Sequence, residues 1–403
     1  MRQKGVVILL LMTVFLVAGA YLFAGSQVTA SRNRIDREKI TAKALAQAKD
    51  ALIGYAVAYS ASHAGDVNGY LPCPDNSGTG IGGAGAAEGS CGNKNVSSIG
   101  RLPWKTLDLS ALRDGSGECL WYAVSGTYKN NPDSDFMDWD NQGLFQALAS
   151  DGTSILADQA VAVIFSPGFA MGSQRHLPAS GTAICGGNYT PSNYLDNDTI
   201  HHVDNASVSS VANAVTKFIQ GPVIDASGNT VVNDGLIYIT REDIFNALKK
   251  RTDFPSFVDN SLLNAASSCL SPSLPQPVTI DFDNMTETAG SSVGNLVTGR
   301  IPMSSCTDKA VRAWRDNLLY AICSSGTACM KVNGLNCTGI LIFAGERDVL
   351  VSQKRETNAE KNDWANYLEG RVYDAFANGQ KNFSGATNFD SASPSADVLA
   401  CIP

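Results

Sequence analysis

The feature that most constrains this chain is an uninterrupted apolar segment near its N-terminus. Residues 6–25 read VVILLLMTVFLVAGAYLFAG and contain no charged side chain, and Arg2 and Lys4 precede them. As a helix this segment would be about 30 Å long, which matches the hydrocarbon thickness of a bilayer. Two cations before an apolar span favour a cytoplasmic N-terminus. The segment therefore predicts a single-pass membrane anchor with the rest of the chain outside the cytoplasm.

A cleaved signal peptide is the alternative interpretation of this segment. The small residues Ala18, Gly19 and Ala20 could provide a peptidase site. The apolar run continues beyond them and is long for a signal peptide, so the retained anchor is favoured.

The residues after the anchor have the pattern of an amphipathic helix. Apolar residues recur at steps of three to five and form one stripe of a helix. No proline interrupts residues 6–62, so one helix could continue from the membrane into a globular part, and two helices hinged near Gly25–Ser26 are the alternative. Gly65 and the NGYLPCPD sequence predict its end. The stripe consists of Ile40, Leu45, Ala48, Leu52, Ala56 and Tyr59.

The cysteines also favour an extracytoplasmic compartment. Ten cysteines are spread over the whole chain, and no C-x2-C pair typical of a zinc knuckle occurs, so disulfides are favoured over metal binding. Cys73 with Cys91 and Cys329 with Cys337 are close enough to close local loops, and the sequence leaves the connectivity open. The disulfide candidates are Cys73, Cys91, Cys119, Cys185, Cys269, Cys306, Cys323, Cys329, Cys337 and Cys401.

The charge balance argues against a nucleic-acid partner. The net charge is -8, charged residues are 17% of the chain, and no basic run occurs outside the N-terminal region. An acidic chain without a basic patch lacks the electrostatic footprint of a nucleic-acid-binding protein.

The first residues, MRQKG, form a short basic leader that ends in Gly5. With the apolar run and the stretches ALAQAKDALIGYAVAYS, GYLPCPD, GRLPWKTLDL and ECLWYAVSGTY, this leader resembles type IV prepilins and type II secretion minor pseudopilins over roughly residues 1–170. The resemblance implies cleavage between Gly5 and Val6 by a prepilin peptidase. It also implies an inner-membrane helix that packs against other pilin or pseudopilin subunits, with its outer half on a small sheet.

The fifth residue after this cleavage site departs from the pattern of major pilins. They carry a glutamate there, which neutralises a neighbour's N-terminal ammonium, whereas this chain has Leu10. An unpaired charge inside a membrane is costly, so a subunit without the glutamate cannot make this pair. The departure favours a position at the filament tip, and some large minor pseudopilins similarly lack the glutamate. A plain signal anchor would lack it too.

Two parts of the chain resemble each other in four blocks that follow in the same order. A duplicated sheet unit and chance similarity among apolar strands both remain open. The first set is GRLPWK at 100–105, LWYAVSG at 120–126, AVAVIFSPG at 160–168 and NYLD at 193–196, and the second is GRIPMS at 299–304, LLYAICSSG at 318–326, TGILIFAGE at 338–346 and NYLEG at 366–370.

Short runs of Val, Ile, Phe and Tyr bounded by Gly, Pro and Ser predict strands. They are LWYAVS, VAVIFS, LIYIT, LLYAIC and ILIFAG. Helices are expected at 208–219 and 241–251, the second with Thr240 as N-cap in a capping box with Asp243. Residues 271–298, rich in Ser, Pro, Thr, Asn and Gly, are expected to be a linker or long loop.

The expected fold class is α+β: a long N-terminal transmembrane-plus-amphipathic helix packed on an antiparallel-rich sheet, with a helical insert and a second sheet unit. The expected divisions are a leader at 1–5, the helix at 6–62, a first α+β unit at 63–198, a helical insert and linker at 199–298, and a second β-rich unit at 299–403.

The sequence contains no recognised catalytic motif, so an enzyme is not expected and no organic cofactor is predicted. The acidic loop NNPDSDFMDWDNQG offers oxygen ligands for calcium from Asp133, Asp135, Asp138 and Asp140, although without the EF-hand spacing; otherwise it is a solvated turn. Asp196, Asn197 and Asp198 form a weaker second group.

The sequence thus favours a structural subunit of a type IV pilus or type II secretion filament. Its expected location is the inner membrane, with the globular part in the periplasm or on a surface filament. A membrane-anchored adhesin or other binding module is the alternative, and an envelope hydrolase is a more distant one.

Overall fold

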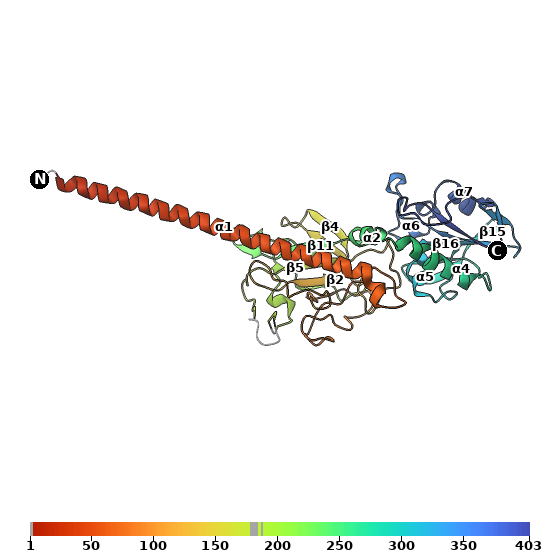
Figure 1. Cartoon of the computed structure of the whole chain (residues 1–403), viewed down its shortest axis with the longest axis horizontal. Helices are drawn as coiled ribbons and strands as arrows, with labels where there is room; N and C mark the ends of the chain where they lie inside the picture. The colour runs from red at the N-terminus through yellow and green to blue at the C-terminus, as the bar shows by residue number, and fades with distance from the viewer. Residues whose placement is uncertain (1–2, 178–183, 187) are drawn as a thin grey trace.

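The computed structural model describes residues 3–177, 184–186 and 188–403, without the side chains of residues 3–31 and 349. One long helix extends from a globular part made of two units that lie one after the other along the direction of the helix (Figure 1). We call residues 63–239 the first unit and residues 254–403 the second unit. The second unit lies beyond the C-terminal end of the helix.

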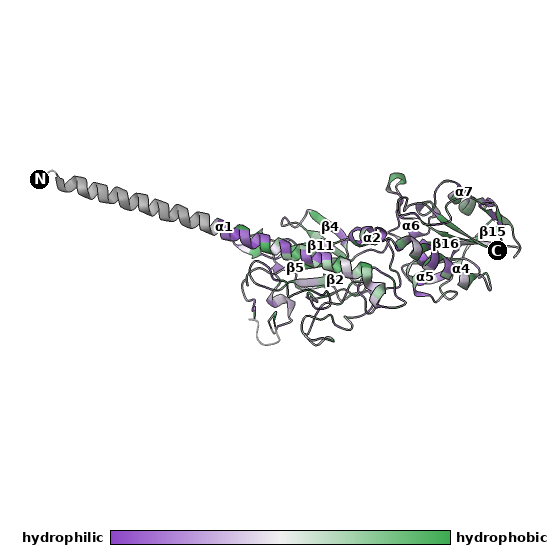
Figure 2. Ribbon diagram, in the orientation of Figure 1, coloured by the Kyte–Doolittle hydropathy of each residue, from purple (hydrophilic) through white to green (hydrophobic). Residues whose placement is uncertain are grey.

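The helix α1 spans Gln3–Ser62, so the expected helix through residue 62 is present as a single element. Its predicted apolar stripe is buried from Leu45 to Tyr59, where α1 lies against the strands β5 (Ala162–Ser166) and β11 (Gly235–Ile239) and the helix α2 (Arg241–Lys249). Polar and apolar residues alternate along this part (Figure 2). Ile40, the first residue of the predicted stripe, is instead 52% exposed, because α1 has already left the globular part there.

The first sheet is four-stranded and antiparallel, in the order β1-β2-β5-β11. Its fourth strand falls inside the predicted insert at 199–298, so the predicted end of the first unit at 198 is corrected to 239. The strands are β1 Ser98–Arg101, β2 Trp121–Val124, β5 Ala162–Ser166 and β11 Gly235–Ile239.

The second sheet is seven-stranded and antiparallel, in the order β13-β12-β15-β16-β19-β21, with β14 also on β15. Residues 271–298, expected to be a linker, supply four of its strands wholly or in part. The bounds are β12 Val278–Asp281, β13 Thr286–Ala289, β14 Ser291–Val293, β15 Leu296–Arg300, β16 Leu318–Cys323, β19 Gly339–Phe343 and β21 Val398–Ile402.

The sequence repeat has a structural counterpart. The order β15-β16-β19-β21 reproduces β1-β2-β5-β11 with the same antiparallel pairing. Arg101 faces Trp121 across the first pair, and Arg300 faces Leu319 across the second. Trp121 then faces Phe165, and Leu319 faces Ile342, so the third block of the repeat is displaced by one residue from the sequence comparison. The strand register thus makes Phe165 the equivalent of Ile342. The comparison of the sequence blocks instead matches Phe165 with Phe343, one residue further along.

Helices between and beyond the sheets complete the fold. The capping box of Thr240 and Asp243 is present at α2, which confirms the predicted second helix. The helical segments are α2 Arg241–Lys249, α3 Phe254–Ser256, the π-helix η2 Phe257–Leu263, α4 Asn264–Leu270, α5 Lys309–Ala313, α6 Asn358–Lys361, α7 Gly370–Asn378 and the 3-10 turns η1 Pro191–Asn193, η3 Arg315–Asn317, η4 Val349–Val351 and η5 Trp364–Asn366.

The predicted helix at 208–219 is wrong. Residues 208–215 lack regular structure and include a turn at 212–213 with Asn213 at a positive φ of 60°, and β8 (Thr216–Ile219) follows in parallel pairing with β3 (Phe145–Leu148). The remaining strands are β3 Phe145–Leu148, β4 Ile155–Ala160, β6 Asn197–Asp198, β7 Val203–Asp204, β8 Thr216–Ile219, β9 Val223–Ile224, β10 Thr230–Val232, β17 Met330–Val332, β18 Leu335–Cys337 and β20 Asn382–Phe383.

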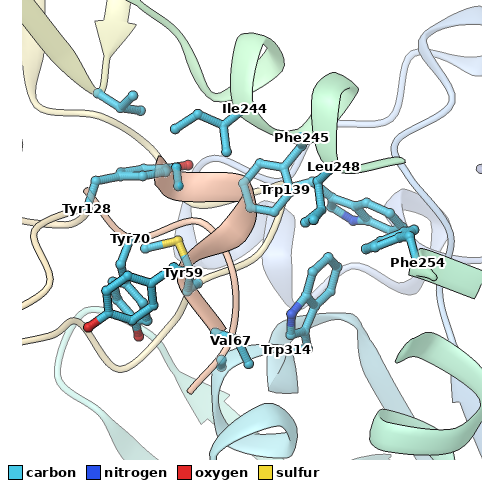
Figure 3. Close-up of a cluster of buried hydrophobic side chains, with 14 of the residues drawn as sticks. Tyr59, Val67, Tyr70, Tyr128, Trp139, Ile244, Phe245, Leu248, Phe254 and Trp314 are labelled. Atoms are coloured by element: carbon cyan, nitrogen blue, oxygen red, sulfur yellow. The ribbon is translucent and has the colours of Figure 1, made fainter. Parts of the chain in front are cut away.

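One hydrophobic core joins the two units. Tyr122 of the first sheet and Tyr320 of the second belong to it, together with the buried faces of α1, α2 and residues 254–270. Figure 3 shows the junction, where Trp139 of the first unit lies near Phe254 and Trp314 of the second. The opposite face of each sheet has a separate core, which contains Trp121 in the first unit and Leu319 in the second. A continuous core of this kind holds the units as one body.

Candidate functional site

The first candidate site is the part of α1 that projects from the globular part. Residues 32–40 are all exposed, including Ile35 and Ile40 at 46% and 52%. Arg34 and Glu38 form an i,i+4 ion pair on this surface, with Nε and Oε1 2.8 Å apart. This segment is therefore mostly in solvent, and Arg37 is the residue of it that contacts the first unit, at Phe169.

A cavity of about 490 Å³ lies where α1 separates from the first unit. Thr41 Oγ1 accepts a hydrogen bond from the Gly115 N–H at 2.9 Å, and the Arg37 guanidinium lies 5.1 Å from the Phe169 ring centroid. Phe169 itself is 54% exposed. These contacts fix the angle at which α1 leaves the sheet.

The predicted processing residues Gly5 and Val6, and the predicted assembly residue Leu10, lie in the part of α1 whose side chains are outside the description. Among the described residues, no helix is both long and apolar enough to cross a membrane.

The second candidate site is the acidic loop at residues 130–143, which inserts into the second unit. Trp139 at its centre is 4% exposed, and its ring lies 5.0 Å from Trp314 in an edge-to-face arrangement and 5.4 Å from Phe343. Aromatic pairs in this geometry add to the burial energy of their surfaces. The loop therefore joins the two units through a buried indole.

The aspartates beside this indole contact cations of the second unit. Asp140 Oδ2 accepts hydrogen bonds from Arg355 Nη1 and Asn317 Nδ2, both at 3.0 Å, and Arg347 Nε lies 3.1 Å from Oδ1. Asp140 and Arg355 are fully buried. A buried pair of this kind is destabilising when one partner is lost, because the other charge is then uncompensated.

A further buried carboxylate, Asp316, is surrounded by donors. Arg300 Nη2 lies 3.2 Å from Oδ1, the Tyr367 hydroxyl donates to Oδ1 at 2.5 Å, and Lys361 Nζ donates to Oδ2 at 2.5 Å. Burial alone would raise the pKa of Asp316, but Lys361 and Arg300 outweigh it and hold this pKa below its usual range. Asp316 is thus ionised.

The pKa of Asp138 is shifted in the opposite direction from the pKa of Asp316. Burial, and then the charge of Asp316, raise the pKa of Asp138 to about 8. Its Oδ1 accepts a hydrogen bond from the Asp140 N–H at 2.8 Å, while its Oδ2 has no partner among the described residues. A protonated carboxyl is the form that this environment favours.

The other two aspartates of the predicted calcium set lie nearer the surface of the same loop. Asp133 is exposed, and Asp135 Oδ1 lies 2.7 Å from Lys94 Nζ and 3.6 Å from Arg312 Nη2. In the described part of the chain, no three His, Cys, Asp or Glu side chains gather as they would around a metal ion. The calcium hypothesis therefore gains no support from this arrangement, in which three of the four aspartates are hydrogen-bonded or ion-paired within the chain.

The second acidic group, at residues 196–198, also organises loops. The Asp196 N–H donates to Asp234 Oδ2 at 2.7 Å, and Asn233 N donates to Asp196 Oδ2 at 2.6 Å. Asp198 Oδ2 lies 2.5 Å from His201 Nδ1. Burial, followed by the charge of Asp196, raises the pKa of Asp234 well above its usual range.

All ten cysteines form disulfides, as predicted. The Cys73–Cys91 pair is confirmed, whereas Cys329–Cys337 is wrong, because Cys329 pairs with Cys323 and Cys337 with Cys401. The others are Cys119–Cys185 and Cys269–Cys306. Each disulfide closes within one unit, so none links the first unit to the second.

The sequence singled out the acidic loop but did not identify the side chains that Asp140 contacts. The signal that it missed is the tryptophan between two aspartates, Asp138-Trp139-Asp140, in a loop without its own core. The complementary cations, Arg347 and Arg355, lie more than 200 residues further along the chain, and only the folded arrangement identifies them.

Comparison with known proteins gives no relative: no protein-family model, curated protein or solved structure matches this chain.

Proposed function

We propose that this chain is a minor structural subunit of a type IV pilus or type II secretion filament. In this proposal residues 6–25 anchor it in the inner membrane after removal of residues 1–5, and the globular part stands in the periplasm or on the filament. The activity is assembly, and no catalytic role is proposed.

The observation that carries the proposal is the division of α1 into two parts. From Leu45 to Tyr59 the helix is buried against an antiparallel sheet, while residues 32–40 are exposed on all sides. The same helix continues away from the globular part into the apolar run at residues 6–25, which in this proposal needs other apolar surfaces to cover it. Packing of such helices side by side is what the resemblance to pilins implies.

Two further observations support a position at the filament tip. Leu10 stands where a glutamate would pair with the ammonium of a neighbouring subunit. In addition, the second unit lies beyond the C-terminal end of α1, on the side away from the proposed membrane anchor (Figure 1). A subunit extended in this direction occupies the space into which a filament would otherwise continue.

The disulfides support the proposed compartment. Five disulfides involve every cysteine of the chain. Such pairing is typical of proteins exported to oxidising compartments and rare in the cytosol of mesophiles.

The first test is the intact mass of the chain expressed with and without a prepilin peptidase. We expect the peptidase to remove residues 1–5 and leave Val6 as the first residue. A Gly5→Leu variant is the matched control and should stay full length. A parent chain that also stays full length, or one that is cut near Ala20, would refute the filament proposal and favour an anchored or secreted binding protein.

A further inference from the structure

Each unit buries two adjacent acidic side chains at the equivalent place in its sheet. In the first unit Asp196 contacts Asp234, and in the second Glu369 contacts Asp397. Asp196 and Glu369 each follow an Asn-Tyr-Leu segment. Asp234 and Asp397 each immediately precede the fourth strand of their sheet, β11 or β21. We call Asp196–Asp234 the first acid pair and Glu369–Asp397 the second acid pair.

The strand register makes the two acid pairs equivalent. Leu236 of β11 lies opposite Phe165, and Leu399 of β21 lies opposite Ile342, which is the equivalent of Phe165. In each unit the strand-side aspartate of the acid pair stands two positions before this leucine. The acid pair is therefore a feature of the repeated four-strand arrangement.

The hydrogen bonds of the strand-side aspartates also correspond. The Asp196 N–H donates to Asp234 Oδ2 at 2.7 Å, and the Glu369 N–H donates to Asp397 Oδ2 at 3.4 Å. In both aspartates the other oxygen, Oδ1, is buried and has no hydrogen-bond partner among the described residues. A buried carboxylate oxygen without a donor is costly, whereas a protonated oxygen needs no donor. The geometry therefore favours a proton on Oδ1 of Asp234 and Asp397.

The groups that contact the first acid pair are neutral donors. Asp196 Oδ1 accepts a hydrogen bond from Gln174 Nε2 at 2.8 Å, and its Oδ2 accepts one from the Asn233 N–H at 2.6 Å. Asn205 Nδ2 donates to Asp234 Oδ2 at 3.0 Å. Three of the four carboxyl oxygens thus accept N–H bonds, which leaves no set of ligands for a cation.

The charged side chains around the first acid pair are bound to other groups. His176 and Arg101 both stack on the tyrosine of the Asn-Tyr-Leu segment, but His176 Nδ1 lies 3.1 Å from Glu118 Oε1 and Arg101 donates to a backbone carbonyl. In the described part of the chain, no titratable side chain between β6 and β8 is hydrogen-bonded to the pair. Those side chains are Asp198, His201, His202, Asp204 and Lys217.

Charged groups do face the second acid pair, but burial outweighs them. Burial raises the pKa of Glu369, although Gln353 and Arg355 lower it, and the charge of Asp348 adds to the rise. Burial, followed by the charge of Glu369, raises the pKa of Asp397 well above its usual range, and Arg355 opposes this rise. Both acid pairs therefore favour the form that keeps a proton.

We propose that each acid pair holds the start of β11 or β21 against the Asn-Tyr-Leu segment while the pair keeps one proton, and that loss of this proton to solvent frees the strand end. In the ionised pair two buried negative charges would stand side by side and repel. The globular part is then closed in acidic surroundings and opens locally, at two equivalent places, as the pH rises. The proposal does not depend on filament assembly, because the globular part alone forms both pairs.

The test is hydrogen exchange of the full chain in detergent, measured by mass spectrometry at pH 5 and pH 8. Protection factors, corrected for the intrinsic pH dependence of exchange, are compared for β11 and β21. The central strands β2 and β16 serve as internal references, so a change common to the whole junction cancels. In the parent, β11 and β21 should each lose at least about tenfold in protection at pH 8, because one pKa unit of differential interaction corresponds to a factor of ten.

Asparagine variants assign the effect to each acid pair. Asp234→Asn and Asp397→Asn place an amide N–H at the proposed protonated oxygen, and the amide cannot ionise. Asp234→Asn should abolish the loss of protection in β11 and leave that in β21, and Asp397→Asn should do the reverse, so each variant is the control for the other. Asp196→Asn should lower the protection of β11 at both pH values, because both Asp196 oxygens already accept N–H bonds.

Any of four results would overturn the proposal. The first is a parent in which β11 and β21 keep the same protection relative to β2 and β16 at both pH values. The second is a pH dependence that persists in both Asp234→Asn and Asp397→Asn, and the third is an equal change of both strands in either variant. The fourth is an Asp234→Asn chain that does not fold, because a protonated Asp234 predicts that the amide is accepted.

Discussion

The two units share the same four-strand arrangement but differ in the groups that surround its buried arginine. In each, a buried arginine at the end of a strand lies under a tyrosine: Arg101 is 4.7 Å from the Tyr194 ring centroid, and Arg300 is 4.8 Å from that of Tyr367. In each, a 3-10 turn immediately precedes the tyrosine. The Asn-Tyr pair found in both sequence copies therefore places a tyrosine ring over the equivalent arginine in each unit.

The difference lies in the charge that faces each arginine. Arg300 has a buried partner in Asp316, whereas Arg101 Nη2 donates to the Asn188 carbonyl at 2.7 Å and makes no ion pair within the described residues. The same strands can thus hold a guanidinium by aromatic faces and a carbonyl, or by a carboxylate. Only the ionic version lies next to the acidic loop that joins the units.

The largest effect should come from the indole that joins the units. Trp139→Ala should lower the free energy of unfolding by about 3–5 kcal/mol, since it empties a buried aromatic site. Hydrogen exchange measured by mass spectrometry should show faster exchange in β16 and β19 than in the parent. Trp104→Ala, at a half-buried site in the first unit, is the control and should cost less. Equal effects would mean that the loop does not join the units.

The local features of this fold were predictable from sequence. Strands such as β2 and β16 are bounded by breakers, and the capping box at Thr240 needs only residues three apart. The error at 208–219 arose because apolar residues there mimic a helical period, while the parallel pairing of β8 with β3 decides the structure. Long-range pairing of this kind leaves no local signal.

The disulfide error has a similar cause. Cys329 and Cys337 are close in sequence, but the β17–β18 hairpin places Met330 opposite Cys337. The pairing of β19 with β21 brings Cys401 near instead. For the acidic loop, residue type predicted a site, but the partners in the second unit depend on the whole fold.

The ion pair beside the indole gives the second prediction. Asp140→Asn should lower the free energy of unfolding by about 2–3 kcal/mol, less than full removal of a buried partner, because the amide oxygen still accepts one hydrogen bond. Asp135→Asn, in the same loop but half-buried, should cost under about 1 kcal/mol. Urea unfolding of the full chain measures both. A cost for Asp135→Asn as large as that for Asp140→Asn would contradict the assigned role of Asp140.

The two tyrosines provide a direct comparison between the units. Tyr367→Phe removes a donor to the ionised Asp316 and should cost about 1.5 kcal/mol, as for a hydrogen bond to a charged group. Tyr194→Phe removes an acceptor for the Leu177 N–H and should cost about 0.5 kcal/mol. Thermal unfolding of both variants tests the order, and the reverse order would show that the charge of Asp316 does not distinguish the second unit.

The last prediction concerns the pH dependence that Asp138 introduces at the junction. Its pKa of about 8 in the folded chain lies far above that of an unfolded aspartate, about 3.9. Between these values the folded chain binds the extra proton, so the stability that this proton provides is complete below about pH 4 and is lost as the pH rises through 8. The resulting slope is at most about 1.4 kcal/mol per pH unit.

Asp138→Asn cannot titrate, so its free energy of unfolding should fall less between pH 5 and pH 8 than that of the parent. Asp234 and Asp397, whose pKa values are also raised by burial, contribute equally to both proteins and cancel in the difference. Asp135→Asn is the control and should follow the parent curve. Parallel curves for Asp138→Asn and the parent would mean that Asp138 is ionised in the folded chain, and that the loop joins the units with two carboxylates instead of one carboxylate and one neutral carboxyl.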